Sequence, residues 1–222
     1  IDSGKMRVFD MRDGLSKNMI SYITEDYRGN IWVGTFGGGI TVFEGEKMKI
    51  YNKSNGLEAT SIHCIFEDKE RNIIIADHYT GISVYKGDHF ATYSDEKILP
   101  DKGVFAVEAD DAGRYWFGTN AGISVFDPGA QGNNFQFYNE ARNAIGNKIR
   151  FLEKDRDGNI WIGTDGNGLF MYDTRKKKFI FDPDINGYFN KNGTITAMTF
   201  DREGKLWIGN MDRLVVWNGS KE

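Results

Sequence analysis

The sequence contains little cysteine, little proline and no long apolar run. Its 222 residues include one cysteine, Cys64, so no disulfide can form within the chain. Only 3 residues are proline, whereas 27 are glycine and 14% are aromatic, as is typical of short strands joined by glycine turns. No apolar stretch approaches the roughly 18 residues that a membrane-spanning helix needs. We therefore expect an all-β chain with no direct membrane insertion.

The sequence also lacks a large excess of charge of either sign. The 28 basic and 32 acidic side chains give a formal net charge of −4. This balance offers no reason to expect nucleic acid or an anionic membrane as a partner. The chain carries no signal peptide but opens at Ile1 in the middle of a repeating pattern, so we expect a processed chain or a piece of a longer protein.

What the sequence does contain is a ten-residue pattern that occurs five times. The clearest copy, residues 155–164, reads Asp-Arg-Asp-Gly-Asn-Ile-Trp-Ile-Gly-Thr, and the aligned tryptophan positions recur every 42 to 46 residues. The second copy is degenerate, with Ile74 in place of tryptophan and Arg71 in place of the turn glycine, which predicts a different or a strained turn there. The copies begin at Asp26, Asp68, Asp110, Asp155 and Asp201.

Each repeat predicts four antiparallel strands. An apolar strand ends at the aspartate, a tight turn leads into the tryptophan strand, and an alternating strand and a short polar strand follow. Four strands in 40 to 46 residues are typical of a β-propeller blade. We predict a single β-propeller domain over residues 1–222. Its blade repeats lie around 17–52, 59–94, 102–139, 147–182 and 193–218.

The two ends of the repeat series are complementary. Residues 5–10 resemble a fourth strand without a blade of its own, while the last repeat lacks a fourth strand. Pairing them would close a ring of five four-stranded blades and remove both exposed edges. The alternative is an arc of a larger propeller, and strand counting fits both arrangements.

The first repeat also carries a family resemblance. Its run from Asp13-Gly-Leu-Ser through Gly29-Asn-Ile-Trp-Val-Gly-Thr35 to Gly38-Gly-Ile40 and Phe43 closely resembles the two-component regulator propeller repeat. The resemblance implies the periplasmic sensor region of a bacterial hybrid histidine kinase or diguanylate cyclase. Several members are similar in sensing breakdown products of polysaccharides. It therefore implies a signal-transduction module without enzymatic activity that binds a glycan or another small ligand, adjoins other sensor domains and could form a homodimer.

Candidate binding residues lie where the copies differ. The loops after the tryptophan strands supply carboxylates, amides and aromatic rings, the mixture that a sugar requires. Arg150 and His63 occupy the fifth position before the aspartate, where the residue type changes from repeat to repeat. Either they face a ligand, or they fill space between blades with a bond to Glu108 or Glu153. The candidate ligand-binding residues are Asp77, His78, Tyr79, Asn120, Arg150, Asp165, Asn167 and Asp212.

Other kinds of site are weakly indicated. Cys64 lies in an apolar column, and Asp155 begins a loop without the ligand spacing of a calcium site. The histidines are too few and too spread for a convincing metal site. We predict no catalytic residue, no metal and no cofactor. Two alternatives stay open: a propeller enzyme, such as a polysaccharide lyase or hydrolase using the loop carboxylates and His78, and a structural or protein-interaction module.

Overall fold

The fold is taken from a computed structural model, which describes residues 6–95, 98–99, 101–131, 134–138, 148–189 and 193–219. Within these residues the chain is all-β, apart from a 3-10 turn, η1 (Lys53–Asn55), and one turn of helix, α2 (Pro183–Asn186). The chain divides into two compact units, Ile1–Thr92 and Tyr93–Glu222. Each unit is described by itself.

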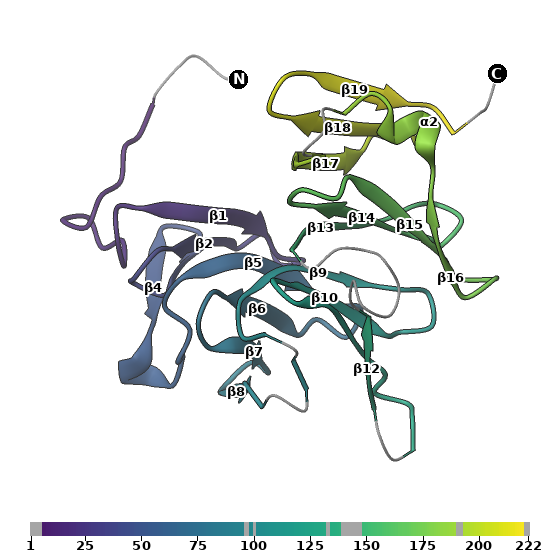
Figure 1. The fold of residues 1–222 in the computed structure, drawn as a ribbon. Coiled ribbons are helices and arrows are strands. Elements are labelled where there is room, and N and C mark those ends of the chain that lie inside the picture. The colour runs from purple at the N-terminus through teal and green to yellow at the C-terminus, as the bar shows by residue number, and fades with distance from the viewer. Residues whose placement is uncertain are drawn as a thin grey trace. The chain divides into compact units, whose positions relative to one another are not determined.

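The first unit contains two antiparallel sheets, and in each sheet the strands pair in sequence order (Figure 1). The first sheet comprises β1 (Ile20–Glu25), β2 (Ile31–Thr35), β3 (Ile40–Glu44) and β4 (Lys47–Tyr51). The second comprises β5 (Ile62–Glu67), β6 (Ile73–Asp77), β7 (Gly81–Tyr85) and β8 (Phe90–Tyr93), whose last residue falls at the boundary of the units.

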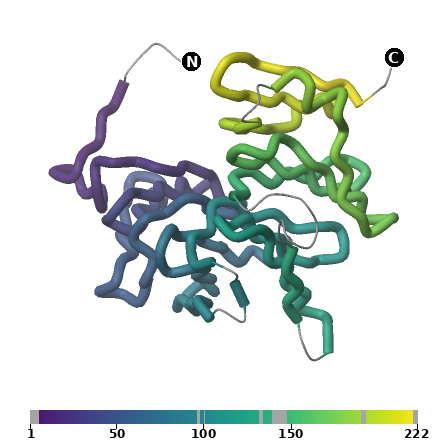
Figure 2. Tube along the Cα trace, viewed as in Figure 1, coloured from purple at the N-terminus to yellow at the C-terminus, as the bar shows by residue number. Residues whose placement is uncertain are grey.

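The second unit contains three sheets built in the same way, and Figure 2 follows their successive hairpins. The first comprises β9 (Val104–Ala109), β10 (Tyr115–Thr119), β11 (Gly122–Phe126) and β12 (Phe135–Tyr138). The next comprises β13 (Ile149–Lys154), β14 (Ile160–Thr164), β15 (Leu169–Asp173) and β16 (Lys178–Phe181). The last comprises β17 (Ile195–Phe200), β18 (Leu206–Asn210) and β19 (Leu214–Trp217).

These five sheets are the blades of a β-propeller, as the repeat predicted. The fifth blade has three strands in the part of the chain that the structure describes. The expected strand over residues 5–10 is wrong for residues 6–10, which lie in no strand, and Lys5 falls outside the described residues. Within the first unit β4 pairs with β3 and is the edge strand of its sheet, and residues 6–10 form no strand pairing with it. Whether the blades form a closed ring or an arc stays a prediction.

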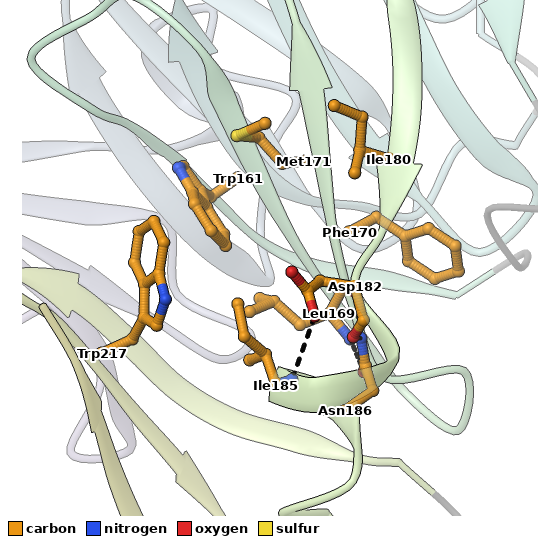
Figure 3. A pocket seen from close by; sticks show the side chains of 9 residues that line it. All are labelled: Trp161, Leu169, Phe170, Met171, Ile180, Asp182, Ile185, Asn186 and Trp217. Carbon is orange, nitrogen blue, oxygen red and sulfur yellow. Dashed lines mark hydrogen bonds between the residues drawn. The ribbon is translucent and has the colours of Figure 1, made fainter. Parts of the chain in front are cut away.

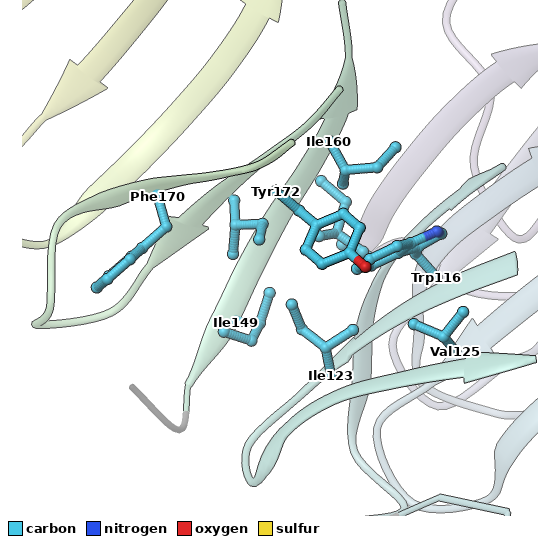
Figure 4. Close-up of a cluster of buried hydrophobic side chains, with 10 residues drawn as sticks. Trp116, Ile123, Val125, Ile149, Ile160, Phe170 and Tyr172 are labelled. Carbon is cyan, nitrogen blue, oxygen red and sulfur yellow. The ribbon is translucent and has the colours of Figure 1, made fainter. Parts of the chain in front are cut away.

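Aromatic residues hold neighbouring blades together. In the second unit the indole of Trp116 is fully buried and lies 4.8 Å, centre to centre, from the ring of Tyr172 on the next blade (Figure 4). In the first unit Trp32 lies 5.8 Å from Tyr85 of the next blade. The tryptophan strand of one blade therefore packs against the third strand of the following blade, which explains why both positions are aromatic.

The repeated aspartate stabilises both the turn and the tryptophan. Asp155 accepts hydrogen bonds from the N–H groups of Asp157 and Asn159 and from the indole of Trp161, the last at 2.9 Å. The indoles of Trp32, Trp116 and Trp207 donate to the aspartates of their own repeats. The indole bond joins residues six apart across the hairpin, and the sequence analysis did not predict it.

The second repeat keeps the same turn despite losing its glycine. Asp68 accepts the N–H of Arg71, as the other repeated aspartates accept that of their turn glycines. Arg71 has a φ of 69°, in the left-handed region that favours glycine. The turn is therefore strained rather than of a different type.

Candidate functional site

The first strand of every blade contains a β-bulge. In each pairing with the tryptophan strand the register shifts around one residue, which is left without a direct partner. A bulge bends its strand and redirects the extra side chain. The bulged residue is the variable fifth position that the sequence analysis identified, so the residues that differ most occupy the same irregular place in each blade. They are Ser21, His63, Phe105, Arg150 and Thr196.

Three blades of the second unit contribute to one group, which we call the Arg150 cluster: Phe105, Arg150, Asp165 and Thr194. The guanidinium carbon of Arg150 lies 3.9 Å from the centre of the Phe105 ring. Its Nη2 lies 3.3 Å from Oδ2 of Asp165, and the Thr194 hydroxyl donates to Oδ1 of the same carboxylate at 3.3 Å. The expected partners Glu108 and Glu153 were wrong, because the bulge directs Arg150 toward the loop that follows β14.

Asn120, Asn167 and Asp212 belong to the corresponding loops of the second unit but have other immediate partners. The Asn120 amide donates to Asp101 at 3.2 Å. Asn167 is exposed, and its N–H donates to the Thr164 hydroxyl. Asp212 is exposed, and its N–H donates to the side chain of Asn210. A common site formed by these three residues and the Arg150 cluster stays a prediction.

Two glutamates on adjacent first strands form the main electrostatic anomaly of this unit. Burial, with a smaller contribution from the Glu108 carboxylate, raises the pKa of Glu153 to about 7. Burial also raises the pKa of Glu108, against the lowering effect of a hydrogen bond from the Ala109 N–H. Glu108 also accepts the N–H of Lys154 at 3.3 Å, which places it against the strand that carries Glu153. The two form a partly buried acidic pair, and the raised pKa of Glu153 favours retention of its proton near neutrality.

The first unit carries an aromatic cluster of its own: Phe36, His63, His78 and Tyr79. Nε2 of His63 and Nδ1 of His78 are 2.9 Å apart, so the two imidazoles share a hydrogen bond. The Phe36 ring packs edge-on against His63, and the Tyr79 ring packs edge-on against His78. Tyr79 is 66% exposed, so its ring is available as a stacking surface.

Asp77 stabilises the loops that carry this cluster. Its side chain is fully buried and accepts hydrogen bonds from the N–H groups of Thr60, Ser61, Tyr79 and Thr80. Direct ligand contact by Asp77, as the sequence analysis expected, is therefore wrong. Three of the other four repeats place a threonine here, such as Thr164, whose hydroxyl donates to the Gly168 carbonyl, and the fifth places Asn210. Asp77 thus replaces a loop-stabilising threonine.

Sequence reasoning missed two members of the Arg150 cluster. Neither Phe105, which holds the variable fifth position of the third repeat, nor Thr194 was among the candidate residues. The usable signal was the variable position itself, since Phe105 and Arg150 hold it in consecutive repeats. No comparable signal identified Thr194, which belongs to a different blade from the carboxylate that it contacts.

Comparison with known proteins finds a family model that matches three of the five repeats. The model of the two-component regulator propeller matches residues 14–37, 143–166 and 190–212, which fall in the first, fourth and fifth repeats. These are two-component regulator propeller repeats. The second repeat, with its altered turn and missing tryptophan, lies outside the match, as does the third, although the third keeps both features.

Relatives of these propeller repeats include signalling proteins. Histidine kinase P4 of Formosa agariphila is 30% identical over 83 residues, covering 36% of this chain and 6% of the kinase. The extracellular domain of a protein described as a hybrid two-component system of B. thetaiotaomicron superimposes with a TM-score of 0.78 at 21% identity, over 96% of this chain and 30% of that one. The chain thus spans a small part of both relatives.

The propeller fold also occurs in an enzyme among the solved structures. Virginiamycin B lyase from Staphylococcus aureus superimposes with a TM-score of 0.69 at 14% identity, over 87% of this chain and 64% of the lyase. An identity this low shows the shared fold alone. The likeness therefore assigns no activity to the propeller repeats of this chain.

The described residues can also be compared with the requirements of a membrane-spanning helix, a metal site and a ligand pocket. Within them no helix is both long and apolar enough to cross a membrane. Nor do they contain a group of three or more side chains suited to holding a metal ion. The second unit has a small apolar pocket of about 90 Å³ between Trp161, Trp217 and Ile185 of α2 (Figure 3). The residues that line this pocket include none of the predicted ligand-binding residues.

Proposed function

We propose that the chain is the ligand-binding part of a bacterial signal-transduction protein, located in the periplasm or outside the cell. Its ligand is an oligosaccharide or another small polar molecule. The observation that carries the proposal is the bulge in every first strand, which projects a different side chain from each copy of a repeated scaffold. A scaffold that is constant in its core and varied at one position per blade suits a recognition surface.

The chemistry of the two clusters supports a polar ring-shaped ligand. A sugar offers an apolar ring face for stacking and hydroxyl groups for hydrogen bonds. The exposed Tyr79 ring supplies a stacking face in the first unit, beside the imidazole pair. Arg150 and Asp165 supply charged hydrogen-bonding groups in the second unit. Neighbouring domains of a larger sensor would receive the signal, and self-association of the chain into a homodimer belongs to the same proposal.

Calorimetric titration with a panel of oligosaccharides tests this function. We expect at least one to bind. We expect Tyr79→Ala or Arg150→Gln to weaken its binding by about tenfold, which corresponds to about 1.4 kcal/mol of binding free energy. Tyr188→Ala is the matched control, since this tyrosine is 60% exposed and belongs to neither cluster. Absence of heat with every glycan, or binding that neither cluster variant alters, would contradict the proposal.

Cleavage assays on the same glycans separate binding from catalysis. We expect no turnover by the wild-type chain. Turnover that disappears in His78→Ala or Asp165→Asn would instead support the enzyme alternative.

A further inference from the structure

The Arg150 cluster contains an ion pair that is only loosely formed. Nη2 of Arg150 and Oδ2 of Asp165 are 3.3 Å apart, and the two side chains are 26% and 34% exposed. Charge-assisted N–H···O bonds usually measure about 2.7–2.9 Å and are often bidentate for arginine. In the same unit Arg114 lies 2.7 Å from Asp110, whose side chain is 1% exposed. The Arg114 pair is a short, largely buried ion pair with a structural role, whereas the Arg150 pair is a single long contact that is partly exposed to solvent.

Phe105 fixes the orientation of the guanidinium without using its hydrogen-bonding edge. The guanidinium carbon lies 3.9 Å above the ring centre, so one face of the group is covered by the aromatic ring. Guanidinium donors lie in the plane of the group, and their fork matches the two oxygens of a carboxylate. An arginine that is stacked on a ring and weakly paired is therefore prepared for an incoming carboxylate.

We propose that Arg150 binds a carboxylate of the ligand and that Asp165 is the internal group which this carboxylate displaces. This inference rests on the proposed ligand-binding function and narrows the ligand to an acidic one. Asp165 keeps its contact with the Thr194 hydroxyl when it leaves the arginine, so its carboxylate retains a hydrogen-bond donor. The exposed Lys148, whose carbonyl accepts the N–H of Asp165, adds a second cation to the loops around the cluster.

Paired probes test the preference for an acid. The probes are acidic and neutral oligosaccharides of the same linkage, such as digalacturonic acid and α-1,4-galactobiose, titrated by calorimetry. We expect the acidic member of at least one pair to bind about tenfold tighter or more, because a hydrogen-bonded ion pair contributes more than a neutral contact. This preference should weaken as salt is added, because part of the site is exposed to solvent.

Two substitutions with opposite expected signs distinguish a ligand anchor from a structural pair. Arg150→Gln should abolish the preference for the acid, and Arg150→Lys should keep only part of it because lysine lacks the planar fork. Asp165→Asn should strengthen binding of the acid several-fold, because the competing charge is removed. Arg175→Gln is the control: it changes the net charge as Arg150→Gln does, but Arg175 is exposed and lies 3.9 Å from Asp157. Thermal unfolding midpoints confirm that each variant is folded.

The outcomes are separable. If Asp165→Asn weakens acid binding as much as Arg150→Gln does, the pair is structural and the inference is overturned. If acidic and neutral members bind equally well, or the neutral members bind better, the inference fails while the ligand-binding function stands. If no member of any pair binds, both fail together.

Discussion

Replacing Glu153 with glutamine should stabilise the protein above neutral pH and leave it unchanged in acid. The substitution keeps the size of the side chain and removes its charge. Burial, and to a smaller extent the Glu108 carboxylate, raises the pKa of Glu153 from its ordinary 4.5 to about 7. The folded state therefore holds a proton that the unfolded chain releases between these values. The resulting stability is complete below pH 4.5 and is lost as the pH rises through 7.

The magnitude follows from the same displacement. One pKa unit corresponds to about 1.4 kcal/mol, so complete ionisation of Glu153 costs the folded state about 3 kcal/mol by pH 8. The side chain is only partly buried, and water reaching the carboxylate reduces this cost. We therefore expect the free energy of unfolding of Glu153→Gln to exceed that of the wild type by about 1–3 kcal/mol at pH 8 and to equal it at pH 4.

Urea unfolding followed by tryptophan fluorescence at several pH values between 4 and 8 measures this difference. Glu203→Gln is the matched control, because Glu203 is exposed and pairs with Lys205 within a surface turn. Glu108→Gln should produce part of the same gain, since it removes the neighbouring charge. Parallel stability curves for the wild type and Glu153→Gln across pH 5 to 8 would refute the reasoning.

Three further predictions concern the scaffold and use the same unfolding measurement. Trp116→Ala should cost about 3–5 kcal/mol, as expected for a buried tryptophan, whereas Trp207→Ala should cost clearly less because that ring is 38% exposed; equal losses would contradict the blade-packing argument. Arg71→Gly should stabilise the second turn by about 1 kcal/mol by relieving its left-handed φ, and a loss of stability would show that the arginine contacts outweigh the strain. Gly118→Ala should cost about 1–3 kcal/mol, since its Cβ would lie 2.7 Å from the neighbouring isoleucine, whereas Gly209→Ala should be tolerated with a nearest contact of 3.4 Å.

Much of the fold could be predicted because each blade repeats one local solution. An aspartate, a turn glycine and a tryptophan lie within seven residues, and their hydrogen bonds form inside a single hairpin. Local interactions of this kind leave a pattern in the sequence. The N-terminal strand was predicted from likeness to a fourth strand, but a strand also needs a neighbouring edge. Composition within residues 5–10 carries no information about that edge.

The candidate site could be predicted only in part, because its partners depend on the bulge. In an unbroken strand side chains alternate strictly between the two faces, so Arg150 would share a face with Leu152. The extra residue breaks this alternation and changes which loop the guanidinium meets. The variability of the position is visible in five aligned repeats, whereas the register shift arises only from pairing with β14.

The same reasoning separates Asp77 from Arg150. Both depart from the repeat, but Asp77 occupies a position whose task is local, the satisfaction of loop N–H groups, and its carboxylate does this in place of a threonine. A substitution at such a position changes the residue type but keeps its role of stabilising the loop. The bulge position has no backbone task that all five residues share, since serine, histidine, phenylalanine, arginine and threonine cannot make one common bond. Departure from a repeat is therefore a sign of recognition only where the scaffold makes no demand on the side chain, and Arg150 meets that condition.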